Sequence, residues 1–154
     1  MKSNILVKIM ANIEKSFEFF DVTADVGFIA YGKTLEESFE NSALAMFNVI
    51  SNTDTIGQTK SFEFSIESED EISLLYDFLE ELLFLHEVEF VLFSDFKVKI
   101  TNEDQKYKLK AKIKGEEINW DVHERGCEVK AITFHQMNVS SEDGIYKTRA
   151  ILDL

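Results

Sequence analysis

Residues 17–39 read FEFFDVTADVGFIAYGKTLEESF, and this stretch contains the pattern that decides the fold. Residues 16–20, which begin just before this stretch, and residues 26–31 within it are rich in aromatic and aliphatic side chains, which is typical of β-strands. The polar segment 21–25 between them predicts a turn. Gly32 ends the second strand. The stretch therefore predicts two short strands that lead directly into a helix.

Two helices are predicted from apolar residues at helical spacing. The first follows a capping box formed by Thr34 and Glu37, and its apolar side chains recur over residues 35–50. The second covers residues 71–87, after a similar capping pattern at residues 68–71. It is apolar over much of its circumference, so it is either buried on two sides or docks a partner, and burial is the simpler interpretation.

The middle of the chain alternates between polar and apolar residues, which indicates strands with one buried face. One expected strand covers residues 62–66, and two more, at 95–100 and 107–114, flank an expected turn at 101–105. The lysines of this hairpin predict a wet, basic sheet face. No aromatic residues interleave with them on that face, which weakens the case for binding single-stranded nucleic acid.

The last third contains an irregular segment at 114–125, extended residues at 128–140, a tight turn at 140–144 and a terminal strand at 146–153. No repeat or linker divides the chain. The fold class expected from this order is α+β, a mostly antiparallel β-sheet sandwich with two helices packed on it. Residues 16–154 are expected to form the single domain.

The composition fits one folded domain with its own core, because 45% of the 154 residues are hydrophobic. Twenty-nine acidic and 16 basic residues give a net charge of -13. This balance argues against autonomous binding of nucleic acid and favours metal ions or a basic protein partner. Cys127 is the only cysteine, so no intramolecular disulfide can form, and a reducing cytoplasm is expected.

Residues 1–15 are expected to be an N-terminal extension or an edge strand, and Met10 is a second candidate for the natural start. The apolar run at residues 5–7 is too short for a signal peptide or a membrane span. No membrane partner is therefore expected.

The familiar catalytic motifs are absent from the sequence: it has no P-loop, GxGxxG, CxxC, HExxH or nucleophile elbow. What remains is a set of carboxylates. Asp21 and Asp25 flank the first expected turn, and Asp153 adjoins Leu154 at the end of the sequence. Oxygen donors of this kind suit calcium, magnesium or manganese ions, although aspartates beside a turn are also common as plain solvated residues.

Lys130 has the same strand parity as Ile132 and Phe134, so its charge would point toward apolar neighbours, which is costly unless it is paired or reaches water. It is either a lysine that extends along the sheet edge into solvent or one aimed at a carboxylate or an anionic group of a partner. His135 follows on the same strand. Like His86 and His123, it lacks the spacing of metal ligands and ranks low as a ligand or base.

Four blocks of the sequence together resemble the archease family: residues 17–39, residues 74–84 (LLYDFLEELLF), residues 128–135 (EVKAITFH) and the ending RAILDL at 149–154. The resemblance implies the α+β fold expected above. It also implies an accessory protein and not an enzyme, because archeases act as cofactors of the GTP-dependent tRNA-splicing RNA ligase. They promote its guanylylation and multiple turnover, so that RNA is met only indirectly.

The resemblance further implies a site. A divalent metal ion (calcium, or magnesium or manganese) would be held by Asp25, Asp153 and Leu154. Lys130 and Asp21 would interact with the partner or its nucleotide. The chain departs from the family at Val22, where a histidine is usual, and that change would weaken or retune the metal site or the partner interface.

Two other functions are alternatives to this one. A chaperone-like modulator of a tRNA methyltransferase, or of another RNA-processing enzyme, would use apolar surface on the second helix more than the carboxylates. A small metal-dependent hydrolase would need a positioned nucleophile or general base beside the acids, and the sequence offers none.

Overall fold

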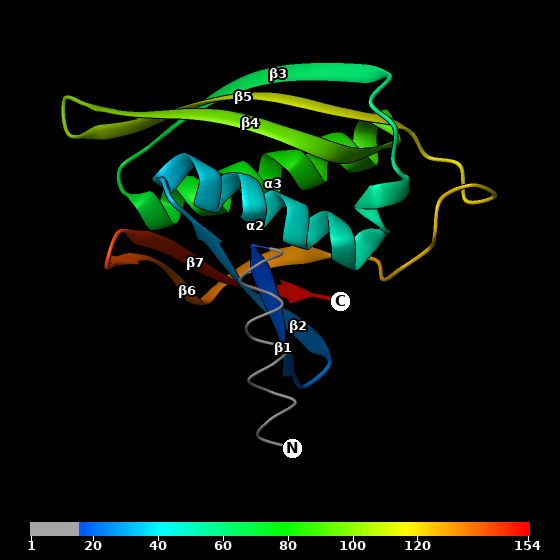
Figure 1. Cartoon of the computed structure of the whole chain (residues 1–154), viewed down its shortest axis with the longest axis horizontal. Coiled ribbons are helices and arrows are strands. Elements are labelled where there is room, and N and C mark those ends of the chain that lie inside the picture. Colours follow the sequence, from blue (N-terminus) through cyan, green and yellow to red (C-terminus); the bar gives the residue numbers. More distant parts are fainter. Residues whose placement is uncertain (1–15) are drawn as a thin grey trace.

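The structure is a computed structural model, and it describes residues 16–154. The expected N-terminal extension at residues 1–15 lies outside the described residues. Figure 1 follows the chain through its elements in order. They are β1 (Phe17–Val22), β2 (Asp25–Gly32), α2 (Leu35–Ile50), a 3₁₀ turn η1 (Thr53–Thr55), β3 (Lys60–Ser68), α3 (Glu71–Glu89), β4 (Val91–Glu103), β5 (Lys106–Glu117), β6 (Ala131–Glu142) and β7 (Ile145–Asp153).

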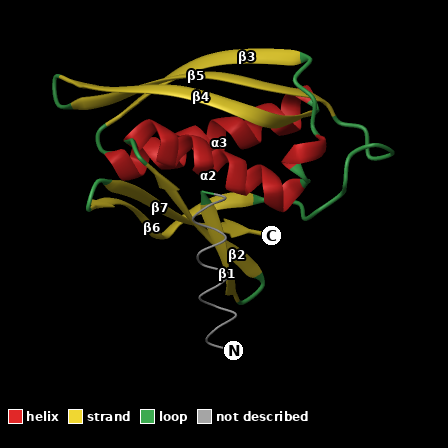
Figure 2. Ribbon diagram, in the orientation of Figure 1, coloured by secondary structure: helices red, strands yellow, loops and turns green. Residues whose placement is uncertain are grey.

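The two helices form the middle layer of a three-layer sandwich (Figure 2). One outer layer is a four-stranded sheet in the order β1-β2-β7-β6, and the other is a three-stranded sheet in the order β3-β5-β4. Every strand pair is antiparallel. The expected α+β class is confirmed. None of the described helices is long and apolar enough to cross a membrane.

Aromatic residues fill the space between the helices and the three-stranded sheet. Phe47 of α2 is fully buried, and its ring centroid lies 5.4 Å from that of Phe93 and 5.7 Å from that of Phe96, both on β4. Phe39 of α2 stacks on Phe78 of α3 with centroids 6.0 Å apart. The prediction that the second helix is buried on a wide face is confirmed, because six of its residues between 74 and 83 are buried.

The N-terminus predicted for α2 is confirmed, since the Glu37 amide donates to Thr34 Oγ1 at 3.0 Å. The capping pattern predicted for α3 is wrong. Asp70 caps that helix and accepts a hydrogen bond from the Ser73 amide at 2.7 Å. Ser68 is still the last residue of β3, and its hydroxyl donates to Asp77 Oδ2 at 2.6 Å instead. The pairing of β3 with β5 therefore includes Ser68, the residue that the local pattern predicted as the start of the helix cap.

The hairpin turns are shorter than the sequence predicted. Only residues 23–24 separate β1 from β2, and only residues 104–105 separate β4 from β5. Asp104 and Gln105 both have positive φ, 53° and 63°, as a two-residue turn with the right-handed twist of its strands requires. Several polar residues that the sequence predicted in turns therefore lie in strands, where each can add backbone hydrogen bonds to the neighbouring strand. Two other predicted bounds also shift, since β5 continues to Glu117 and β6 begins only at Ala131.

Replacing Phe47 with alanine should lower the free energy of unfolding by about 3–5 kcal/mol, because the cavity would open in the middle of the aromatic cluster. Phe84→Ala is the matched control, since Phe84 is 54% exposed on a helix. Urea denaturation measures both. Equal shifts of the two unfolding midpoints would contradict this account of the core.

Candidate functional site

The four-stranded sheet brings the beginning of β2 and the end of β7 together. Asp25 lies directly opposite Asp153 in the antiparallel register. Residues paired in this way project to the same face of a sheet, with Cβ atoms about 4.5–5.5 Å apart. The amide of Leu154 donates to Asp25 Oδ1 at 3.4 Å. All three residues are half-buried, so the structure gathers them into one cluster.

Two carboxylates placed opposite each other repel, and a cation between them would offset that repulsion. Their oxygen atoms are the donors that calcium, magnesium and manganese prefer. No group of three or more His, Cys, Asp or Glu side chains within residues 16–154 could hold a metal ion. A cation at Asp25 and Asp153 would therefore need further oxygen ligands, and Leu154 is the residue nearest in the chain to supply one.

The cluster continues as a row across all four strands. Val22 of β1 is opposite Asp25, and Ala131 of β6 is opposite Asp153. The row faces away from the helices, because the neighbouring Leu152 on β7 has the opposite parity and is fully buried. Val22, where the sequence departs from the usual archease pattern, is thus the cross-strand neighbour of Asp25.

Asp21 is separated from this row. It pairs with Val26, so it projects from the face of the sheet opposite to that of Asp25, and it is exposed. His135 is exposed in the irregular part of β6, where the register shifts between Thr133 and Asn138. The structure therefore brings together Asp25 and Asp153 with Leu154, but leaves Asp21 and His135 apart from them.

Lys130 is joined to the cluster through the backbone, because its amide donates to the main-chain oxygen of Asp153 at 2.8 Å. Its side chain is exposed and lines a shallow cavity between α3 and the start of β6, together with Glu80 and Glu87. Within residues 16–154 it forms no ion pair. Its position is the one expected for a lysine that extends along the sheet edge into solvent.

Apolar side chains are exposed beside that cavity. The rings of Phe134 and Tyr76 stack with centroids 3.9 Å apart, yet Phe134 remains 55% exposed. Phe84 and Val88 follow along α3 at helical spacing and are 54% and 56% exposed. Several large apolar groups exposed in one region are typical of a surface that meets another protein.

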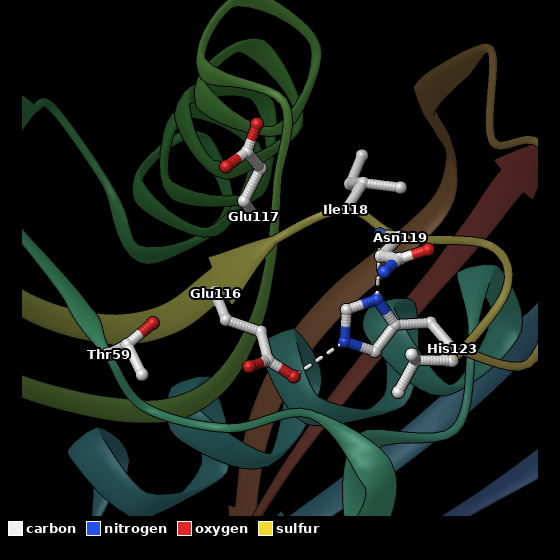
Figure 3. Close-up of a pocket in the computed structure, with 7 residues that line it drawn as sticks. Thr59, Glu116, Glu117, Ile118, Asn119 and His123 are labelled. Carbon is white, nitrogen blue, oxygen red and sulfur yellow. Dashed lines mark hydrogen bonds and ion pairs between the residues drawn. The ribbon is translucent and has the colours of Figure 1, made fainter.

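A second hollow, of about 470 Å³, lies beside the segment between β5 and β6 (Figure 3). His123 is buried there, and its Nε2 lies 2.6 Å from Glu116 Oε1. The Asn119 amide donates to His123 Nδ1 at 3.0 Å, so Nε2 carries the proton that is shared with Glu116. The sequence reasoning missed Glu116, and no local motif could have revealed a pairing that depends on the path of this loop.

Glu116 and His123 hold this loop in place. The Gly57 amide donates to Glu116 Oε1 at 2.8 Å, and this bond together with the one from His123 lowers the pKa of the Glu116 carboxyl. Both imidazole nitrogens are thus engaged by the protein. The pair has the properties of a structural anchor and not those of a general base, which needs a free nitrogen to accept a proton.

Comparison with known proteins agrees with the fold. The model of the archease protein family (MTH1598/TM1083) matches residues 17–154. Protein archease of Methanothermobacter thermautotrophicus is 56% identical over 140 residues, which are 91% of this chain and 99% of that protein. Protein archease of Pyrococcus furiosus is 45% identical over 141 residues, with the same two coverages of 91% and 99%.

Solved structures agree as well. The solution structure of Methanobacterium thermoautotrophicum protein 1598 is similar with a TM-score of 0.83 at 56% identity, over 91% of this chain and 99% of that one. The crystal structure of an archease from Thermotoga maritima, described as a possible chaperone, has a TM-score of 0.56 at 19% identity over 88% and 94% of the two chains, which bears on the fold alone. The chain belongs to the archease family.

Proposed function

We propose that this chain is an accessory protein of a GTP-dependent RNA ligase, and that it promotes guanylylation and multiple turnover of that ligase. The observation that carries the proposal is the register of β2 and β7, which sets Asp25 opposite Asp153 with Leu154 beside them. A divalent cation, calcium or else magnesium or manganese, would be held by the two side chains and the carboxylate of Leu154. When bound, it would supply positive charge for the phosphate oxygens of the ligase nucleotide.

The other parts of the site have roles that suit an accessory protein. The Lys130 backbone is bonded to Asp153 and its side chain reaches solvent at the edge of the sheet, so it is free to contact a carboxylate or a nucleotide phosphate of the partner. The exposed aromatic surface around Phe134 and Phe84 would supply apolar contact area for the same partner. Catalysis would belong to the ligase, because no nucleophile or free base accompanies the acids in the described part of the chain.

The exposed apolar surface of α3 also supports a second candidate, a chaperone-like modulator of a tRNA methyltransferase. One relative of known structure is described as a possible chaperone. This function would depend on Phe84 and Phe134 and would tolerate the loss of Asp25. A Phe84→Ser variant that loses methyltransferase binding, while Asp25→Ala keeps it, would favour this candidate.

Asp25→Ala should lower the multiple-turnover rate of RNA ligation by the cognate ligase by about 10-fold or more, because it removes one of the two side-chain ligands. The comparison is with wild-type protein and with Glu69→Ala, which removes the same charge from an exposed position beyond β3. Full stimulation by Asp25→Ala, or none by the wild type, would reject the proposed mechanism.

Adding residues after Leu154 converts its carboxylate into a neutral amide. We expect this extension to weaken binding of calcium or manganese by about 10-fold, whereas an N-terminal tag leaves the affinity unchanged. Isothermal titration calorimetry measures the metal affinity of the two proteins. Equal affinities would remove Leu154 from the set of ligands.

Val22→His would place an imidazole next to Asp25 in the row across the sheet. Because imidazole favours zinc more than calcium, we expect the affinity for zinc to rise by about 10-fold while that for calcium changes little. Val122→His, on an exposed loop, is the control for a histidine that binds zinc by itself. An equal rise in both variants would show that position 22 does not adjoin the metal.

A further inference from the structure

Basic residues are concentrated on one face of a protein that is otherwise strongly acidic. The net charge is -13, yet seven of the 16 basic residues lie between positions 97 and 114. These seven are Lys97, Lys99, Lys106, Lys108, Lys110, Lys112 and Lys114. On β5 they alternate with Leu109, Ala111 and Ile113, which are buried toward the helices. The lysines therefore occupy the outer face of the sheet β3-β5-β4, which we call the lysine face.

The register of the sheet places lysines directly opposite each other. Lys97 of β4 pairs with Lys112 of β5, and Lys99 pairs with Lys110. Like charges at directly opposite positions destabilise a sheet. A solvent-exposed face requires polar residues but not lysines opposite each other, so this arrangement lowers the stability of the sheet without being needed for solubility.

Only part of this charge is neutralised by the protein. Three ion pairs join lysine Nζ atoms of this face to glutamate oxygens: Lys106–Glu67 at 3.2 Å, Lys108–Glu103 at 4.0 Å and Lys112–Glu63 at 3.7 Å. Within residues 16–154, no ion pair is formed by the other four lysines, which are Lys97, Lys99, Lys110 and Lys114. A hollow of about 310 Å³ on this face is lined by Lys99, Thr101, Glu103, Lys108 and Lys110.

The residue types on the lysine face indicate which class of molecule it binds. Protein interfaces have an apolar and aromatic core and are depleted in lysine, whereas this face is polar throughout. Single-stranded nucleic acid is held by aromatic side chains on which bases stack, and the outward positions of β4 and β5 carry none. A surface with lysines but no aromatic side chains is suited to contact the phosphates of a duplex. An RNA helix is such a duplex, and proteins recognise it mostly by its shape and by backbone contacts.

We propose that the lysine face binds the phosphate backbone of an RNA helix without reading its sequence. The negative charge of the remaining surface repels RNA elsewhere, so the helix is directed to this one face. The lysine face lies on the other side of the helix layer from β2 and β7, the strands that carry Asp25 and Asp153 (Figure 1). One protein can therefore contact an RNA helix and present its carboxylates to a second molecule at the same time.

The test uses the isolated full chain and a fluorescent RNA duplex, with affinity measured by anisotropy between about 50 and 200 mM salt. The wild type should bind more weakly as salt rises. In Lys99→Gln/Lys110→Gln the salt slope should fall by about 2, one for each phosphate contact, and the affinity at low salt should drop about tenfold or more. Lys33→Gln/Lys147→Gln removes the same charge from two positions outside the lysine face, one between β2 and α2 and one on β7, and should bind like the wild type.

The stability of the variants provides an independent check. Because it removes one facing pair of lysines, Lys99→Gln/Lys110→Gln should have an unfolding midpoint equal to or above that of the wild type. Two results would overturn the inference: no binding of the duplex by the wild type at low salt, or equal losses of affinity in the two double variants. No ligase is present, so the outcome is separate from that of the ligation assay.

Discussion

The whole structure depends on the burial of two helices from both sides. α2 contacts β2 and β7 of one sheet and β4 of the other, and α3 has the same double role. Each sheet has one apolar face, which must be covered, and the helix layer covers both. Phe47 and Phe39 are fully buried within this layer. If the helices were apolar on only one side, one of the two sheets would expose its apolar face to water.

This constraint leaves the two outer sheet faces free for other uses. Both faces can take polar and charged residues because the inward residues alone supply the core. The four-stranded sheet carries the row that contains Asp25 and Asp153, and the three-stranded sheet carries the lysine face. The carboxylates Asp25 and Asp153 and the lysine face are thus kept apart by the helix layer. A protein that works between a metal-dependent enzyme and its RNA would benefit from this separation.

The site itself is made by strand pairing and not by any loop or motif. Asp25 and Asp153 are distant in the sequence, and β2 and β7 hold them opposite each other through a ladder that extends from there to Gly32. The backbone bond between Lys130 and Asp153 adds a third segment. Rigid elements hold carboxylates more exactly than mobile loops do, which would be an advantage for the proposed cation site. The same register makes Val22 the cross-strand neighbour of Asp25.

Much of the fold could be predicted from the sequence, because helix spacing, strand alternation and the Thr34 cap depend on neighbouring residues. The two helices, the strands and the basic face of the hairpin follow from such patterns. Predictions failed where pairing with distant strands overrode local preference. Ser68 stays in β3 and leaves the cap of α3 to Asp70, and the hairpin turns shrink to two residues.

The candidate site was likewise predictable only in part from the sequence. The sequence by itself showed that Asp25 and Asp153 are acids near strand ends, and only family resemblance joined them. Tertiary structure decided that they face each other, that Asp21 projects to the opposite face, and that Glu116 holds His123. The physical reason is that side-chain periodicity is local, whereas register and loop path depend on contacts between segments that lie far apart in the chain.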